Sequence, residues 1–267
     1  MDERLREIVD DLEAEQAALG DLLDTLEPAD WDRDTHAPGW LVRDQVTHLA
    51  QFDEAARLGW ADPEGFREQA ERERQGPGSF EERYLAEGRA MTPGELLARW
   101  RAASNALVAA ARESVPPERV PWYGPAMSPA SFLTARLMET WSHGLDVADA
   151  VAADAPQTDR LRHIAFIAVR ARPFSYQNRG MDVPAGNVFV QLHSPGGQVW
   201  EFGDSNAENR VSGDAYEFCC VLTRRRHVDD TLLAVEGPLA REWMEIGQAF
   251  AGPPGEGRQP GQFGRKD

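Results

Sequence analysis

The sequence predicts a helical domain followed by a smaller domain of the α+β class. Up to about residue 150, apolar side chains recur at the three- and four-residue spacing of amphipathic helices. After the segment 152–159 the pattern changes, and residues 188–202 read as two strands joined by a Pro-Gly-Gly turn. We therefore assign residues 1–152 to a four-helix bundle, 160–250 to an α+β domain and 251–267 to a disordered tail.

The first two helices are predicted from their apolar stripes. Residues 3–26 carry leucine and isoleucine at spacings of three, four and seven, and acidic side chains cover the other face. A second helix is expected from about Leu41 to Gly59. Its inner stripe holds Leu41, Gln45, His48 and Phe52.

Two further helices each begin with a hydroxyl residue followed by proline. Thr92 and Pro93 start one that runs to about Ser114, and Ser128 and Pro129 start another that ends near Ala150. The charged segment 61–92 is expected to be a long crossover with a short helix near residues 80–86. Four helices with one long connection predict a bundle with a crossover.

The second half mixes short helices and strands, so an α+β domain is expected. Its predicted elements are helices at 161–173, 213–222 and 239–250 and strands at 188–192, 198–202 and 231–235. The last residues, GPPGEGRQPGQFGRKD, have no apolar period, and such a composition is typical of a disordered segment.

Composition disfavours several classes of function. The chain has 45 acidic and 28 basic residues and a formal charge of −17, a field that repels nucleic acid and anionic membranes. No stretch is long and apolar enough for a membrane span, and the acidic N-terminus does not resemble a signal peptide. The two cysteines, Cys219 and Cys220, are adjacent and form no disulfide framework. These features predict a cytoplasmic protein that binds no nucleic acid.

A possible metal site lies in the run RLMETWSHGLD. Glu139 and His143 are four residues apart and project from one face of a helix. If that helix faces the second one, His48 joins them, giving two imidazoles, a carboxylate and an open position, as in catalytic zinc sites. The spacing alone also allows a surface ion pair between Glu139 and Arg136 and a histidine that only packs in the core.

The same residues carry a resemblance to a known family. The run PGWLVRDQVTHLAQFD, followed about ninety residues later by RLMETWSHGLDVADA, resembles the N-terminal domain of mycothiol-dependent maleylpyruvate isomerases, in the DinB-like superfamily. The resemblance covers roughly residues 5–150 and implies that His48, Glu139 and His143 bind a divalent metal, typically zinc. The segments VWEFG, VSGDAYEFCCVLTRR and LLAVEG are similar to the sterol-carrier-like α+β domain that follows in such proteins. The whole chain most resembles an actinobacterial group of metal-binding proteins within this superfamily.

Other candidates surround this predicted site. Asp146, three residues after His143, could support a ligand imidazole or simply carry surface charge. Arg224 and Arg225 end a predicted helix; they could complement its dipole or hold the carboxylates of a thiol cofactor. Trp122 and Tyr123 could anchor their proline-rich loop or form an aromatic wall of the site.

The sequence is compatible with three functions. The resemblance implies a zinc enzyme that uses mycothiol as co-substrate, acting as an isomerase or S-transferase on a small electrophile. The same site could activate water for hydrolysis, although no general base can be named. In a third reading the chain is a non-catalytic metal-binding protein whose second domain binds a ligand or partner. Another divalent metal could replace zinc.

Overall fold

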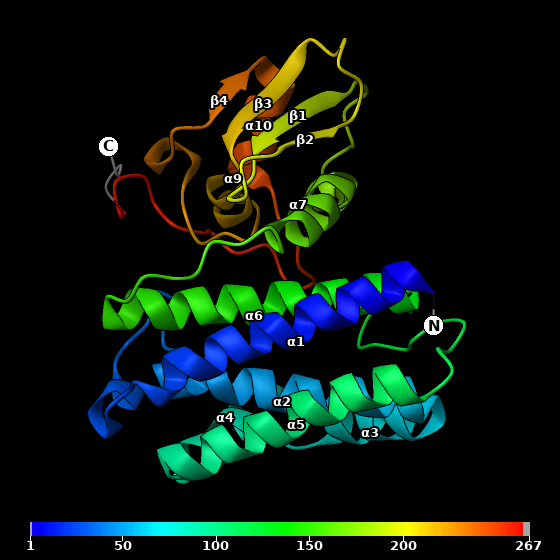
Figure 1. Cartoon of the computed structure of the whole chain (residues 1–267), viewed down its shortest axis with the longest axis vertical. Helices are drawn as coiled ribbons and strands as arrows, with labels where there is room; N and C mark the ends of the chain where they lie inside the picture. Colours follow the sequence, from blue (N-terminus) through cyan, green and yellow to red (C-terminus); the bar gives the residue numbers. More distant parts are fainter. Residues whose placement is uncertain (1, 264–267) are drawn as a thin grey trace. The chain divides into compact units, whose positions relative to one another are not determined.

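The structure is a computed structural model that describes residues 2–263 (Figure 1). The chain forms two compact units that divide between Ala155 and Pro156. The first unit is helical, and the second combines helices with a four-stranded sheet. A helical domain followed by an α+β domain, the fold class predicted from the sequence, is thereby confirmed.

Four long helices build the first unit: α1 (Glu3–Asp24), α2 (Val42–Ala61), α5 (Pro93–Glu113) and α6 (Pro129–Val151). Helix α1 packs on α5 and α6, and α2 packs on the same two helices (Figure 1). Their apolar stripes meet in a buried core, in which Leu49, Trp100 and Leu137 are at most 1% exposed. A short 3-10 helix, η1 (Pro28–Asp32), lies between α1 and α2 and buries Trp31.

The predicted starts of the third and fourth long helices are confirmed. The Thr92 side chain accepts from the backbone N–H of Glu95, and Glu95 in turn accepts from the backbone of Thr92, so both ends of a capping box are present. Ser128 accepts from the backbone N–H of Ser131, and Pro129 follows at the first helical position. Local sequence therefore fixes where α5 and α6 begin.

The connection from α2 to α5 holds more helix than the sequence predicts. It contains α3 (Pro63–Gln75) and α4 (Phe80–Ala90), whereas only a short piece near residues 80–86 was expected. Helix α3 buries only Phe66 and Ala70, and its many charges concealed the apolar pattern. Asp62 caps α3 and Ser79 caps α4, and both caps can be read in the sequence.

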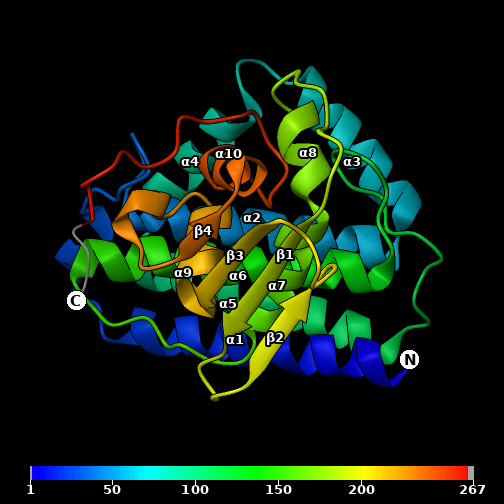
Figure 2. The ribbon, with the colours of Figure 1, turned by 90° about the horizontal axis from the view of Figure 1, so that it is seen from above.

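The second unit contains a sheet of order β2-β1-β3-β4 (Figure 2). Strand β1 (Val188–His193) pairs antiparallel with β2 (Val199–Phe202) and parallel with β3 (Asn209–Asp214), and β3 pairs antiparallel with β4 (Ala234–Glu236). The predicted hairpin is confirmed. The helices and turns of this unit are α7 (Leu161–Arg170), α8 (Arg172–Gln177), α9 (Ala215–Leu222), η2 (Val228–Asp230) and α10 (Pro238–Ile246).

Four expectations for this unit were wrong in detail. Strand β3 was not predicted, because Val211 is its one fully buried side chain. The helix expected at 213–222 begins only at Ala215. The strand expected at 231–235 is shorter and later, at β4. The helix expected at 161–173 is divided at Ala171, and that expected at 239–250 ends at Ile246.

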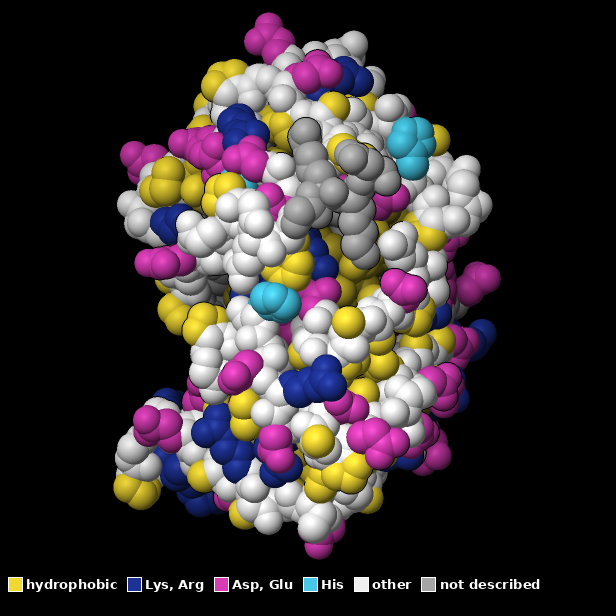
Figure 3. All heavy atoms as spheres, turned by 90° about the vertical axis from the view of Figure 1, so that its left-hand side faces the viewer, with side chains coloured by type: hydrophobic (Ala, Val, Ile, Leu, Met, Phe, Trp, Pro, Cys, Tyr) yellow, Lys and Arg dark blue, Asp and Glu magenta, His cyan; other side chains and the backbone are white. Residues whose placement is uncertain are grey.

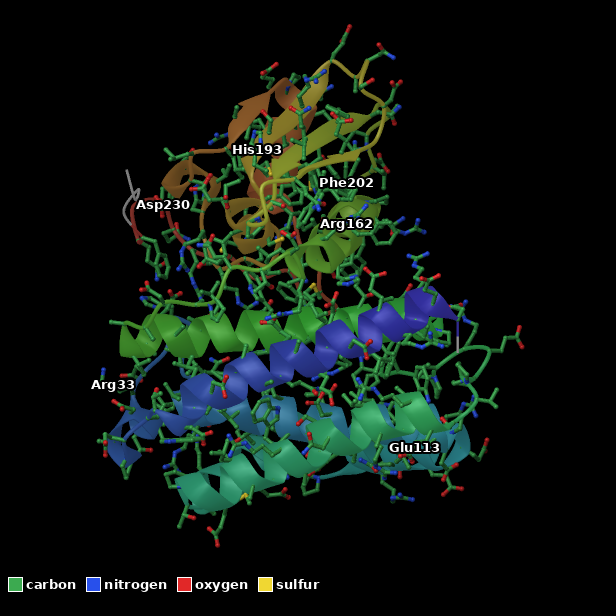
Figure 4. The ribbon with its side chains drawn as sticks, viewed as in Figure 1. Arg33, Glu113, Arg162, His193, Phe202 and Asp230 are labelled. Carbon is green, nitrogen blue, oxygen red and sulfur yellow. The ribbon has the colours of Figure 1, made fainter. Side chains whose placement is uncertain are left out.

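Residues 251–263 continue as irregular chain along the second unit. The Asp230 carboxylate accepts from the backbone N–H groups of Gly261 and Phe263 (Asp230 is labelled in Figure 4). Arg224 donates to the carbonyls of Gly255 and Glu256. The sequence predicts disorder over 251–267; of these residues, 264–267 lie outside the part that the structure describes.

The surface carries both signs of charge. On the face drawn in Figure 3, acidic and basic side chains lie among one another rather than in separate fields. Within residues 2–263, no helix combines the length and apolar character that crossing a membrane requires.

A close approach between α4 and α2 generates the first prediction. A methyl group on Gly88 would overlap the side chain of Thr47, which is 0% exposed and β-branched, so it cannot move aside. We expect Gly88→Ala to lower the free energy of unfolding by about 1–3 kcal/mol in urea titrations. Gly94→Ala is the control: nothing lies within 4 Å of its new methyl group, so stability should stay level or rise. Equal stabilities of the two variants would contradict the close contact.

Candidate metal centre

The three residues singled out in the sequence lie together in the helical unit. His48 comes from the middle of α2, and Glu139 and His143 project from one face of α6. Glu139 Oε2 lies 3.3 Å from His48 Nε2 and 3.2 Å from His143 Nε2. One ligand atom from each residue lies within 4.8 Å of the other two. The packing of α2 on α6 therefore places two imidazole nitrogens and a carboxylate around one point.

One interpretation of the sequence pairs Arg136 with Glu139. In the structure Arg136 pairs with Asp53 instead. Its guanidinium donates from Nε and from one terminal nitrogen to Asp53 Oδ1, at 3.0 and 2.9 Å. Both side chains are buried, at 4% and 0% exposure. Arg136 therefore ties α6 to α2 beneath the histidines and leaves Glu139 to face the two rings.

The other nitrogen of each ring also has a partner. His143 Nδ1 lies 2.6 Å from Gln45 Oε1, and His48 Nδ1 lies 3.2 Å from the Tyr84 hydroxyl. Neither role is predicted from the sequence. Gln45 could have been noticed, because it lies three residues before His48 on the same stripe; nothing in the sequence points to Tyr84. These contacts set the orientation of both imidazoles.

Burial and neighbouring charges determine the protonation of the cluster. Burial, followed by the nearby His143, lowers the pKa of His48 to about 4. Burial raises the pKa of Glu139, but hydrogen bonds and charge from His143 and His48 outweigh it, so the pKa ends well below its usual value. At neutral pH His48 is then a neutral imidazole and Glu139 a carboxylate, which are the forms that bind metals.

The donor set fits a first-row divalent cation. Two imidazole nitrogens and a carboxylate oxygen are ligands that zinc accepts, and three protein ligands leave a coordination position for another molecule. The ligand side chains are 11–23% exposed, so the group is reachable from solvent. A cation would also neutralise the charge of Glu139, which the buried Arg136 does not contact.

Aromatic rings surround the cluster. The Trp40 indole is stacked over the His143 ring at 6.0 Å and 16°, and Phe52 lies 4.5 Å from the His48 ring. The Phe52 ring also packs on Trp122 and Tyr123, with ring centroids 6.0 and 5.5 Å apart. The two residues of the proline-rich loop therefore fill both roles considered: they pack as anchors, and they extend an aromatic wall that reaches the histidines.

Three further residues are candidates from the sequence. Asp146 is buried on α6, and its support of a ligand imidazole stays a prediction; the oxygen that contacts His143 Nδ1 comes from Gln45. Arg224 and Arg225 belong to the second unit and donate to backbone carbonyls there, Arg224 to Glu245 and Arg225 to Thr223. A role for either arginine in cofactor binding stays a prediction.

The second unit also holds histidines and cysteines for which no role is predicted from the sequence. His193 ends strand β1 and is exposed (Figure 4). Cys219 and Cys220 are fully buried free thiols, and burial raises the pKa of Cys219 well above its usual value. Such a thiol is a poor nucleophile.

Comparison with known proteins identifies the family that the helical unit matches. Residues 12–148 match the family model described as the mycothiol maleylpyruvate isomerase N-terminal domain. Two uncharacterized proteins of Mycobacterium tuberculosis, from strains CDC 1551 / Oshkosh and ATCC 25618 / H37Rv, are each 41% identical over 251 residues, covering 94% of this chain and 97% of theirs.

Two solved structures are similar in fold. They are crystal structures of the mycothiol-dependent maleylpyruvate isomerase and of a mutant of it in which alanine replaces a histidine. Their TM-scores are 0.55 and 0.56, at 18% and 16% identity, and each match covers 83% of this chain and 90% of the other.

The ion pair beneath the site generates a prediction about stability. Arg136→Met leaves the carboxylate of Asp53 buried without its cation, which should cost about 3–5 kcal/mol of unfolding free energy. The double variant Asp53→Leu/Arg136→Met should regain most of this loss in urea titrations, since neither charge of this pair is then buried.

Arg99→Met serves as the matched control. Arg99 pairs with Glu54 between α5 and α2, but these side chains are 19% and 42% exposed. Solvent screens the pair, so the loss should stay below about 1 kcal/mol. A double variant as unstable as Arg136→Met alone would show that burial of the unpaired charge is not the cause.

Proposed function

The chain belongs to the mycothiol maleylpyruvate isomerase N-terminal domain family, and from this membership we propose that it is a metal-dependent enzyme of thiol chemistry. In this proposal His48, Glu139 and His143 bind a divalent cation, zinc being the first choice. Mycothiol is the thiol co-substrate, and a small electrophile is the substrate. The supporting observation is the convergence of three ligand atoms from two helices on one point.

The proposed chemistry follows from the donor set and its surroundings. Zinc held there would lower the pKa of a thiol that joined it, so that the thiolate exists at neutral pH. The two imidazoles and Glu139 hold the cation, while the rings of Trp40 and Phe52 limit the access of water. Addition of the thiolate to an activated double bond turns that bond into a single bond, which can rotate. Loss of the same thiolate then restores the double bond in the other geometry, which is an isomerisation. If the new sulfur–carbon bond is kept and the resulting carbanion takes a proton from water, the outcome is S-transfer.

The place of action follows from the same chemistry. A thiol co-substrate must stay reduced, and Cys219 and Cys220 are free thiols. We therefore propose that the protein works in the cytoplasm.

Metal binding is tested by elemental analysis of purified protein. His143→Ala and Glu139→Gln should each lower zinc occupancy at least about tenfold, because two ligands do not retain the cation at neutral pH. His193→Ala is the control, since it removes an exposed histidine of the second unit. Equal zinc content in all four proteins, each folded by circular dichroism, would remove the assignment.

Thiol dependence is tested with maleylpyruvate and other electrophiles in the presence of mycothiol. Removal of the metal with a chelator should abolish turnover, and added zinc should restore it. The double variant Cys219→Ser/Cys220→Ser should keep its rate, because these thiols are buried. Tight zinc binding without thiol turnover would favour a non-catalytic binding protein. Zinc-dependent ester or amide cleavage without thiol would favour a hydrolase.

A further inference from the structure

A continuous chain of hydrogen bonds leads from the His143 ring to a backbone carbonyl. His143 Nδ1 lies 2.6 Å from Gln45 Oε1, and Gln45 Nε2 lies 2.9 Å from Thr35 Oγ1. The Thr35 hydroxyl lies 2.8 Å from the carbonyl oxygen of Trp40. Gln45 is 0% exposed, so its amide depends on these partners rather than on water.

The donor and acceptor of each hydrogen bond follow from the last group in the chain, the Trp40 carbonyl. A carbonyl oxygen only accepts, so the single hydroxyl proton of Thr35 goes to Trp40. Thr35 Oγ1 must then accept from its other neighbours, which are the backbone N–H of Ala37 at 3.2 Å and the side chain of Gln45. The amide nitrogen of Gln45 therefore faces Thr35, and its oxygen faces His143. This settles an orientation that the shape of an amide leaves ambiguous.

The hydrogen of His143 is thereby placed on Nδ1. An amide oxygen can only accept, so the ring nitrogen beside it must carry the proton. In the neutral ring the lone pair then lies on Nε2, the atom 3.2 Å from Glu139 Oε2. Two acceptors at this distance repel unless a cation or a proton lies between them. The Tyr84 hydroxyl beside His48 can donate or accept, so it imposes no such choice on that ring.

We propose that Gln45 is a positioning residue that holds His143 in the Nδ1–H form and so presents Nε2 to a divalent cation. Thr35 and the Trp40 carbonyl anchor the amide of Gln45. The consequence for zinc affinity rests on the proposed function, whereas the ring tautomer can be observed in metal-free protein.

Zinc affinity, measured by competition with a chromophoric chelator, gives the first test. Gln45→Leu should lower the affinity about 10–100-fold, the loss typical of removing a hydrogen-bond partner of a ligand histidine. Gln45→Glu should keep most of the affinity, because one carboxylate oxygen also accepts from Nδ1 and the Thr35 hydroxyl can turn from the Trp40 carbonyl to donate to the other oxygen. Gln51→Leu is the matched control: Gln51 lies on α2, is 8% exposed and accepts from Arg99. The control should bind zinc as the wild type does.

The tautomer gives the second test, by NMR of the ring nitrogens in metal-free protein at a pH where the ring is neutral. The His143 hydrogen should lie on Nδ1 in the wild type and in Gln45→Glu, and this preference should be lost in Gln45→Leu. Thr35→Val, which frees the amide of Gln45 to turn over, should weaken the preference and serves if Gln45→Leu does not fold.

The two tests separate this inference from the proposed function. A wild type that binds no zinc but carries the His143 hydrogen on Nδ1 would refute the metal site and leave the tautomer assignment standing. A hydrogen on Nε2 in the wild type, or equal zinc affinity of the wild type and a folded Gln45→Leu, would overturn the role of Gln45.

Discussion

The packing of α2 against α6 is the contact on which the rest of the helical unit depends. It places His48 within 3.3 Å of Glu139 and, beneath them, buries Asp53 against Arg136. Each of these polar groups would be costly in the core without its partner, so the register of the two helices is specified by charge as well as by apolar surface. A shift of α2 by one helical turn along α6 would separate His48 from Glu139 and Asp53 from Arg136 at the same time. The same contact thus supports stability and brings together the donor atoms that could hold a cation.

The long connection between α2 and α5 completes the surroundings of this contact. Helix α4 supplies Tyr84, whose hydroxyl meets His48, and Gly88, whose lack of a side chain lets α4 approach α2. Helix α3 supplies Phe66, on which Trp122 is stacked at 5.7 Å and 8°. Apolar rings near the donor atoms lower the local dielectric constant, which strengthens the attraction between a carboxylate and a cation. The segment that reads as a charged crossover therefore forms one side of the site.

The loop that precedes α2 connects the candidate metal centre to the backbone by hydrogen bonds. Thr35 and Trp40 bond to each other, Gln45 bonds to Thr35, and His143 bonds to Gln45. Gly39 has a positive φ of 79°, which lets this tight loop turn so that the Trp40 indole lies over the His143 ring. The Trp40 carbonyl can only accept a hydrogen bond. Through Thr35 and Gln45 it thus determines which nitrogen of His143 is free to bind a cation.

The sequence by itself determined the four long helices, the caps of α5 and α6, the hairpin β1–β2 and the choice of His48, Glu139 and His143 as candidate ligands, because periodicity and capping chemistry act over a few neighbouring residues. It did not reveal α3, whose charges hide two buried side chains, or β3, whose identity as a strand comes from pairing with β1 and β4. Only the tertiary structure decided that Arg136 pairs with Asp53 and that Gln45 and Tyr84 hold the histidine rings. A periodic pattern tells which face of a helix is buried. It does not tell which atom of a residue 98 positions away will meet that face, since the packing of the two helices sets that distance.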